Sequence, residues 1–136
     1  MSRPVILLVE DDPEDVRFFK RAAEKAGLDC RLVVAEDGQI AVDRLSSRED
    51  GPTHVLLDLK LPRKSGLEVL EWIRSHSTLG KTPVIVLTSS EVQSDLQRAH
   101  GLGVDAYLVK PLTSAELEGV VRRIADRWNI GPGAPD

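Results

Sequence analysis

Residues 54–66 read HVLLDLKLPRKSG, an apolar run that ends in Asp58 and continues into a segment containing Pro62 and Gly66. A short apolar run bounded by turn residues is typical of a strand covered on both faces. A carboxylate at the end of such a strand lies where α/β sheets bind their ligands. This stretch therefore predicts a parallel sheet and a functional carboxylate at its edge.

Apolar runs alternate with amphipathic segments along the whole chain. The runs that predict strands are 5–9, 32–35, 55–57, 84–87 and 104–109. The segments with helical periodicity are 16–26, 39–46, 67–73, 92–99 and 113–128. Such alternation predicts an α/β fold with helices on both faces of a parallel sheet and right-handed crossovers. We expect a flavodoxin-like, doubly wound sheet of five strands in the order 2-1-3-4-5, with five helices.

Several residues at the predicted helix ends support these boundaries. Asp12-Pro13 reads as an N-cap followed by a proline in the first turn, and Gly27 as a stop. Thr113 and Glu116 have the spacing of a capping box before the last helix. Trp72 and Trp128 are expected at the edge of the core, with a place in an interface as the alternative.

Length and composition predict one domain, residues 1–128, followed by a disordered tail, residues 129–136. The net charge is −4, which argues against a general affinity for nucleic acid. No apolar run reaches the ~20 residues that span a bilayer, so no membrane association is predicted. The single Cys30 cannot form an internal disulfide, and we expect a cytoplasmic protein.

Reactive side chains follow four of the predicted strands. They are Glu10 and Asp11, Asp58, Thr88, and Lys110. In the predicted strand order the crevice opens where the first and third strands end, which brings the three acids together with the hydroxyl and the amine beside them. Each residue alone has an ordinary structural explanation, such as a turn cap or a solvated side chain. Their joint occurrence at strand ends predicts a site.

Three converging carboxylates repel one another unless a cation neutralises them. Oxygen ligands alone favour Mg²⁺, with Mn²⁺ as the alternative. We expect Asp11, Asp58 and the Lys60 backbone carbonyl to be direct ligands and Glu10 to act through a bound water. Asp58 could then attack a phosphoryl group and form an acyl phosphate, while Lys110 and Thr88 bind the transferred oxygens.

At this point the chain resembles the receiver domains of two-component response regulators, over roughly residues 4–128. The motifs that carry the resemblance are ILLVEDD at 6–12, LDLKLP at 57–62 with Gly66, PVIVLTS at 83–89 and YLVKP at 107–111. The resemblance implies that Asp58 is the phosphoacceptor, that Glu10 and Asp11 form the acidic pocket, and that Thr88 and Lys110 contact the phosphoryl group. It also implies a switch role for Tyr107 and a cis peptide bond before Pro111.

The resemblance implies partners as well. A histidine kinase would donate the phosphoryl group, and the similarity extends to receivers paired with phytochrome-type kinases. The resemblance also implies that the chain can form a homodimer through the predicted segments 92–99, 104–109 and 113–128. We expect no turnover enzyme: the chain would catalyse its own phosphorylation and its own dephosphorylation, and it would signal as a stand-alone regulator through a changed binding surface.

Three other functions compete with this interpretation. A pseudo-receiver, a phosphate-independent interaction module, would have no use for the full set of site residues. A small phosphohydrolase commonly needs a carboxylate two residues after its nucleophile, where this chain has Lys60. A nucleotide-binding flavodoxin-like protein would need a glycine-rich loop after the first strand, which the sequence lacks.

Overall fold

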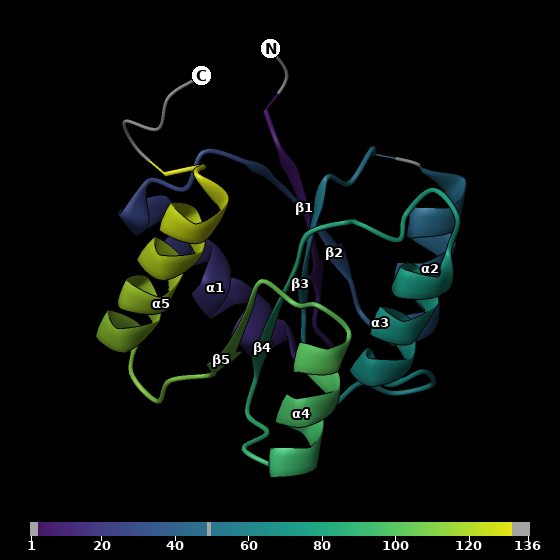
Figure 1. Ribbon diagram of the computed structural model, residues 1–136. Helices are drawn as coiled ribbons and strands as arrows, with labels where there is room; N and C mark the ends of the chain where they lie inside the picture. Colours follow the sequence, from purple (N-terminus) through teal and green to yellow (C-terminus); the bar gives the residue numbers. More distant parts are fainter. Residues whose placement is uncertain (1–2, 49, 132–136) are drawn as a thin grey trace.

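One parallel sheet of five strands organises the residues that the computed structural model describes, 3–48 and 50–131. The strands are β1 (Val5–Val9), β2 (Arg31–Ala35), β3 (His54–Leu57), β4 (Val84–Thr88) and β5 (Ala106–Val109). Their order is β2-β1-β3-β4-β5, and all pairs are parallel (Figure 1). The predicted fold and strand order are confirmed.

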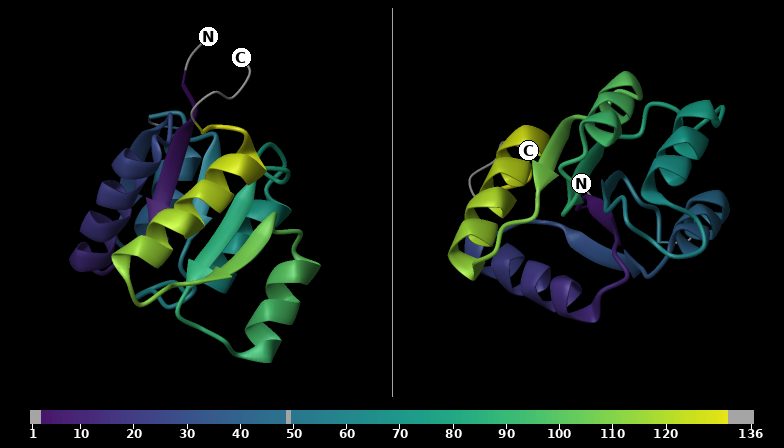
Figure 2. Two further views of the ribbon diagram at one scale, coloured as in Figure 1. Left: turned by 90° about the vertical axis from the view of Figure 1, so that its left-hand side faces the viewer. Right: turned by 90° about the horizontal axis from the view of Figure 1, so that it is seen from below.

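Five helices cover the two faces of this sheet. They are α1 (Pro13–Ala26), α2 (Gly38–Ser47), α3 (Gly66–Ser75), α4 (Gln93–Gly101) and α5 (Ser114–Trp128). Helices α1 and α5 pack together on one face, and α2, α3 and α4 lie on the other (Figure 2). The sheet therefore separates two apolar cores. Successive residues of β1 alternate between them, Leu7 in one and Ile6 in the other, as the pleat of a strand requires.

The predicted helix signals can be followed into the structure. Asp12 caps α1 by accepting the Glu14 N–H at 2.9 Å, and Gly27 ends it at a φ of 71°. Thr113 accepts the Glu116 N–H at 3.1 Å, as predicted, while its hydroxyl donates to the Glu116 carboxylate at 2.9 Å. The bonds from Asp12 and Thr113 to backbone N–H groups satisfy donors that a helix start leaves without an intrahelical partner.

Strand β5 starts later than the sequence predicts. It begins at Ala106, because Val104 donates its N–H back to the Ala99 carbonyl at 3.4 Å, after the turn at Gly103. Asp105 then donates its N–H to the Val84 carbonyl at 2.8 Å and brings the chain alongside β4. The two residues expected to open the strand instead join it to α4.

The segment expected to be a tail is in part packed against the domain. Asn129 ends α5 in the left-handed conformation, at a φ of 56°. Ile130 is buried and accepts the Asp29 N–H at 2.9 Å. Residues 132–136 lie outside the described residues. None of the helices within 3–48 and 50–131 has the length and apolar content needed to cross a membrane.

The loop between β3 and α3 is held by two close backbone approaches. A Cβ at Gly66 would lie 2.1 Å from the Asp58 carbonyl oxygen, and a Cβ at Gly38 would lie 1.9 Å from the Lys64 carbonyl oxygen. Ser65 and Glu68 form a complete capping box at the start of α3. The loop that follows Asp58 is therefore fixed both to the strand end and to the start of α2.

At the opposite end of the sheet, the edge where the strands begin, the guanidinium of Arg74 connects several turns. Arg74 of α3 donates to the carbonyls of Gly80, Thr82, Leu102 and Gly103 at 2.6 to 3.2 Å. It thereby holds the chain segments that lead into β4 and β5.

The same edge carries an aromatic contact between β3 and α5. The His54 ring lies 4.7 Å from the Trp128 ring, and the indole N–H of Trp128 donates to Asp105 at 2.8 Å. Trp72 and Trp128 both pack at the margins of the cores, as predicted.

Candidate functional site

The register of the sheet brings the predicted site residues together. Val9 of β1 lies beside Leu57 of β3, so Glu10 and Asp58 leave the sheet side by side. Thr88 ends the neighbouring strand β4. Its carbonyl accepts the Lys110 N–H at 2.8 Å, which places Lys110 at the same edge. Four strands thus deliver acids, a hydroxyl and an amine to one place.

Three carboxylates at this edge form a cluster suited to a metal ion. Single oxygens of Glu10, Asp11 and Asp58 all lie within 4.8 Å of one another. Glu10 and Asp58 are buried, whereas Asp11 is exposed. An oxygen-only donor set suits a hard divalent cation such as Mg²⁺ or Mn²⁺. The residues present therefore fit the predicted metal.

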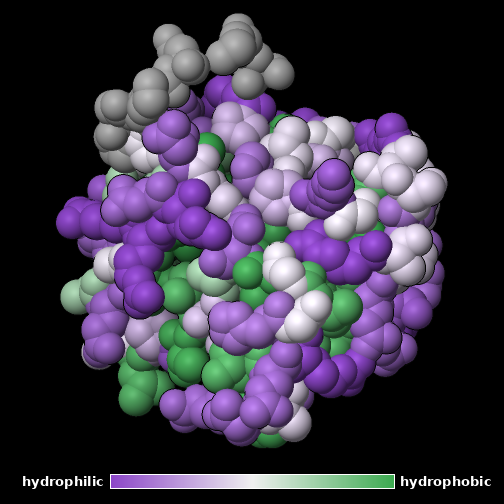
Figure 3. Space-filling model, viewed as in Figure 1, coloured by the Kyte–Doolittle hydropathy of each residue, from purple (hydrophilic) through white to green (hydrophobic). Residues whose placement is uncertain are grey.

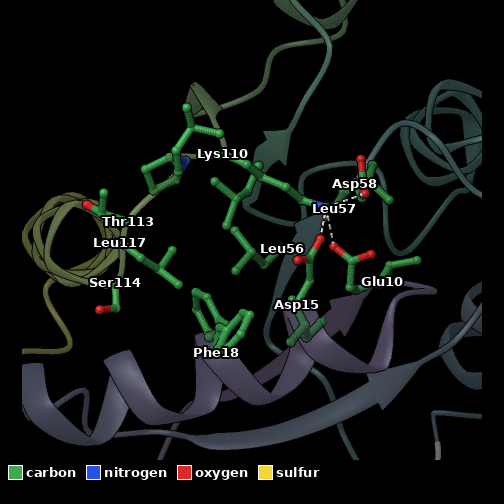
Figure 4. Close-up of a pocket in the computed structure, with 16 residues that line it drawn as sticks. Glu10, Asp15, Phe18, Leu56, Leu57, Asp58, Lys110, Thr113, Ser114 and Leu117 are labelled. Carbon is green, nitrogen blue, oxygen red and sulfur yellow. Dashed lines mark hydrogen bonds and ion pairs between the residues drawn. The ribbon is translucent and has the colours of Figure 1, made fainter.

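The ammonium of Lys110 is shared among three carboxylates, as the dashed lines in Figure 4 show. Its Nζ lies 2.5 Å from Glu10, 2.8 Å from Asp58 and 2.9 Å from Asp15. Burial disfavours the charged amine, but hydrogen bonds to Asp58, Glu10 and Asp15 outweigh burial and raise the pKa of Lys110. Lys110 is therefore a fixed positive charge at the centre of the site.

Burial acts in the other direction on the neighbouring acid. It raises the pKa of Glu10 to about 7, although hydrogen bonds from Lys110 and from the Asp12 backbone N–H favour the carboxylate. The repulsion from Asp58 adds to the effect of burial. The site thus concentrates more negative charge than one ammonium neutralises.

Asp58 is held from both of its oxygens. Its Oδ1 accepts the Thr88 hydroxyl at 2.7 Å and the Lys60 N–H at 3.2 Å, and its Oδ2 accepts the Lys110 ammonium at 2.8 Å. Thr88 is fully buried, and its oxygen in turn accepts the Ser90 N–H at 3.3 Å. Lys60 itself is exposed. Donors to both oxygens fix the orientation of the carboxylate.

Tyr107 lies one step away from this cluster. Its hydroxyl donates to the Ser90 carbonyl at 3.0 Å, and Ser90 donates its own hydroxyl to Asp95 at 2.7 Å. Burial raises the pKa of the phenol, so Tyr107 stays a hydrogen-bond donor. The tyrosine is thereby tied to the segment that leaves β4 directly after Thr88.

The prediction of a cis peptide bond before Pro111 is wrong. No peptide bond among the described residues is cis, so Lys110 and Pro111 are joined in the trans form. The trans form of a bond before proline is favoured by about 0.5–1 kcal/mol unless the surroundings select the other. The trans bond still places Lys110 on Asp58.

An apolar cavity of about 290 Å³ adjoins the charged cluster between α1 and the start of α5. Phe18, Leu56 and Leu117 line its apolar part, and Asp58 and Lys110 stand at its polar end (Figure 4). Phe18 and Leu112 remain exposed at its margin. A molecule that approaches the charged cluster from this side passes over apolar surface.

Sequence reasoning missed one member of the site. Asp15 was not among the predicted site residues, but it contacts Lys110 from the first turn of α1. No strand-end pattern points to it, because it lies on a helix. The spacing from Asp11 gives no signal either, because Asp11 precedes the N-cap Asp12 and lies outside the helix.

Comparison with known proteins identifies the family. The model of the response regulator receiver domain matches residues 6–122. The chain belongs to this family. Receiver domains are the signalling modules of two-component systems, and the acidic cluster here is compatible with Mg²⁺ binding and phosphorylation of an aspartate.

Two curated relatives match this receiver domain over most of their own length. The regulatory protein FilR2 of Methanothrix harundinacea is 40% identical over 136 residues, covering 95% of this chain and 88% of that protein. Response regulator Rcp1 of Synechocystis sp. is 35% identical over 129 residues, covering 91% of this chain and 88% of that protein.

Solved structures show the same likeness. The Mn²⁺-bound form of Rcp1 superposes with a TM-score of 0.84 at 34% identity, over 98% of this chain and 99% of that one. The phosphorylated cyanobacterial phytochrome response regulator RcpA gives a TM-score of 0.85 at 32% identity, over 93% and 94%. This receiver domain is therefore related to phytochrome response regulators.

Proposed function

We propose that this receiver domain accepts a phosphoryl group on Asp58 from a phosphohistidine of a histidine kinase, with Mg²⁺ as cofactor. The observation that supports this best is the pair of donors on Asp58: Thr88 on one oxygen and Lys110 on the other, beside Glu10 and Asp11. A carboxylate held in this way is a preorganised nucleophile next to groups that neutralise charge.

The chemistry asks little of the protein beyond positioning. A carboxylate oxygen of Asp58 forms the new P–O bond as the P–N bond of the donor breaks, and the bonding electrons leave with the imidazole. Asp58 already carries its charge, so no general base is needed. The transferred group spreads charge over three oxygens, and catalysis consists mainly of neutralising them.

The residues of this site divide that task. Lys110 donates to one phosphoryl oxygen and the Thr88 hydroxyl to another. Glu10 and Asp11, with Asp58, would hold the Mg²⁺, and the Lys60 carbonyl is proposed as a further ligand. When bound, the metal ion neutralises the carboxylates and the phosphoryl oxygens. The structure of Rcp1 in its Mn²⁺-bound form supports a divalent metal in a similar domain.

Phosphorylation would reach the surface through Thr88 and Tyr107. If Thr88 turns from Asp58 toward the new phosphoryl oxygens, the segment that follows it moves with it. That segment holds the Ser90 carbonyl to which Tyr107 donates. Tyr107 would then leave this bond and turn inward. Such a change is a two-state element biased by the phosphoryl group, whose charge of roughly −1.5 to −2 replaces the single charge of the Asp58 carboxylate.

The surface that would change is formed by α4, β5 and α5. Val92, Val109 and Leu112 are large apolar residues exposed on it, and apolar surface is visible on the lower half of this face in Figure 3. We propose that this face binds the downstream partner or a second copy of the chain. A phytochrome-type kinase is the proposed donor, since RcpA is a phytochrome response regulator. The net charge of −4 argues against nucleic acid as the partner, and the proposed location is the cytoplasm.

Intact-protein mass after incubation with Mg²⁺ and acetyl phosphate tests the proposal. We expect one phosphoryl adduct on the wild type, which is lost in Asp58→Asn and lost when a chelator removes the metal. Asp126→Asn is the matched control, because Asp126 is an exposed aspartate of α5. If the folded wild type forms no adduct, the phosphate-independent interaction module becomes the better description.

A further inference from the structure

Asp15 contacts the site from a helix, whereas the other site residues lie at the ends of strands. It lies in the first turn of α1, and its Oδ2 is 2.9 Å from the Lys110 Nζ (Figure 4). The first turn is fixed by the Asp12 cap and by Pro13. Asp15 therefore presents its carboxylate to Lys110 from a rigid element.

The geometry around Lys110 accounts for all of its donors. An ammonium has three N–H groups, and here it faces three carboxylates, those of Glu10, Asp15 and Asp58. Only Asp58 changes when a phosphoryl group is added. The bonds to Glu10 and Asp15 can persist, while the third N–H passes from the Asp58 oxygen to a phosphoryl oxygen.

We infer that Asp15 is a positioning residue, which together with Glu10 holds the Lys110 ammonium where the phosphoryl group arrives. This inference rests on the proposed phosphorylation of Asp58. One anchor would leave the long lysine side chain free to turn about it, whereas two anchors from different elements fix its direction. The side chain of Asp15 is 38% exposed and paired with Lys110, so water and the ammonium both weaken its repulsion of the phosphoryl group.

The rate of adduct formation with acetyl phosphate and Mg²⁺ tests the role of Asp15. In Asp15→Ala, Lys110 loses one anchor, and we expect phosphorylation to slow roughly fivefold, since small misplacements of catalytic groups cost up to about 100-fold. Asp15→Asn retains an oxygen acceptor and should fall between Asp15→Ala and the wild type. Glu14→Ala removes a charge of the same sign from the same turn, on an exposed residue, and should leave the rate unchanged.

A stability measurement without metal shows whether the effect runs through Lys110. Urea unfolding of Asp15→Ala, Lys110→Ala and the double variant should show coupling: the double variant loses less than the two single variants together. If Asp15 acts independently of Lys110, the losses add, and additivity would overturn the inference.

The remaining outcomes separate this inference from the proposed function. A wild type that forms an adduct at the same rate as Asp15→Ala overturns the positioning role alone. A wild type that forms no adduct overturns the proposed function and the inference with it. If Asp15→Ala is unfolded by circular dichroism, Asp15→Asn carries the test, and a rate equal to that of Glu14→Ala overturns the inference.

Discussion

Buried charge is stabilised differently at the two ends of the sheet, the edge where the strands end and the edge where they begin. Where the strands end, three carboxylates share the ammonium of Lys110, and burial raises the pKa of Glu10 to about 7. Where the strands begin, the Arg74 guanidinium donates to four neutral carbonyls, and Asp105 accepts the indole N–H of Trp128. Where the strands end, four carboxylates face one ammonium, whereas the Arg74 guanidinium is matched by neutral acceptors. The first arrangement suits the phosphoryl chemistry proposed above, and the second contributes to stability alone.

The largest loss of stability in this comparison is expected from Lys110→Ala. Removing the ammonium leaves Glu10 and Asp58 buried without a countercharge, and we expect a loss of about 3–5 kcal/mol in the free energy of unfolding. Urea denaturation at pH 8 without metal measures it, with the exposed Lys20→Ala as control. Adding Asp58→Asn to Lys110→Ala should recover part of the loss. A loss no larger than that of Lys20→Ala would show that the carboxylates do not depend on this amine.

Arg74→Met tests the opposite edge and should have the second largest effect. The apolar side chain replaces the stem but leaves four carbonyls without their donor, which we expect to cost about 2–4 kcal/mol. Arg74→Lys should recover little, because one ammonium lacks the fork that reaches both loops. Urea denaturation checks both variants. Full recovery in the lysine variant would show that charge alone is needed there.

Removing one carboxylate should raise the stability where the strands end and lower it where they begin. Asp58→Asn relieves repulsion with Glu10 and Asp11, and we expect it to raise the stability of the metal-free protein by about 1 kcal/mol. Asp105→Asn weakens the bond to Trp128 and should lower stability by about 1 kcal/mol. Thermal unfolding in the presence of a chelator compares the two. If both substitutions destabilise, the carboxylates at the site are already compensated.

The smallest effect is expected from acidification at the strand-beginning edge. Burial lowers the pKa of His54 below its ordinary value of 6.5, although Asp105 opposes the shift. The folded protein therefore takes up this proton less readily than the unfolded chain. The stability from the neutral imidazole is present above pH 6.5 and is lost as the pH falls below it.

Replacing His54 should remove this part of the pH dependence. We expect His54→Gln to flatten the stability profile between pH 7 and 5 by less than about 1 kcal/mol. The control is His100→Gln, an exposed histidine of α4. Urea midpoints across this pH range provide the measurement. An unchanged slope in His54→Gln would show that His54 does not contribute to acid sensitivity.

The sequence predicted the site residues at the strand ends because strand ends follow from local patterns. Apolar runs end at Glu10, Asp58, Thr88 and Lys110, and a parallel sheet brings such ends to one edge. Asp15 was missed because a helix residue reaches the site only through the packing of α1, which no local pattern encodes. The bond before Pro111 was mispredicted because sequence allows either isomer, and tertiary contacts decide between them.

The packing that completes the opposite edge was also beyond prediction from sequence. Arg74 directly follows the predicted helical segment 67–73, and nothing near it in the chain indicates four carbonyl acceptors. Its acceptors come from two loops, one of which lies 28 residues away in sequence. Such contacts depend on how α3 lies against the segments before β4 and β5, which only the folded structure specifies.

The position of the two tryptophans has a consequence for spectroscopy. Trp72 and Trp128, the only tryptophans of the chain, lie in the later turns of α3 and α5, away from the edge where the carboxylates meet. Neither indole lines the cavity beside Asp58. A metal ion at the acidic cluster would therefore not quench either fluorophore by contact. Any change in emission on adding metal or phosphodonor would report a rearrangement transmitted across the domain. The fluorescence of the two tryptophans therefore measures this structural change and not the binding of metal itself.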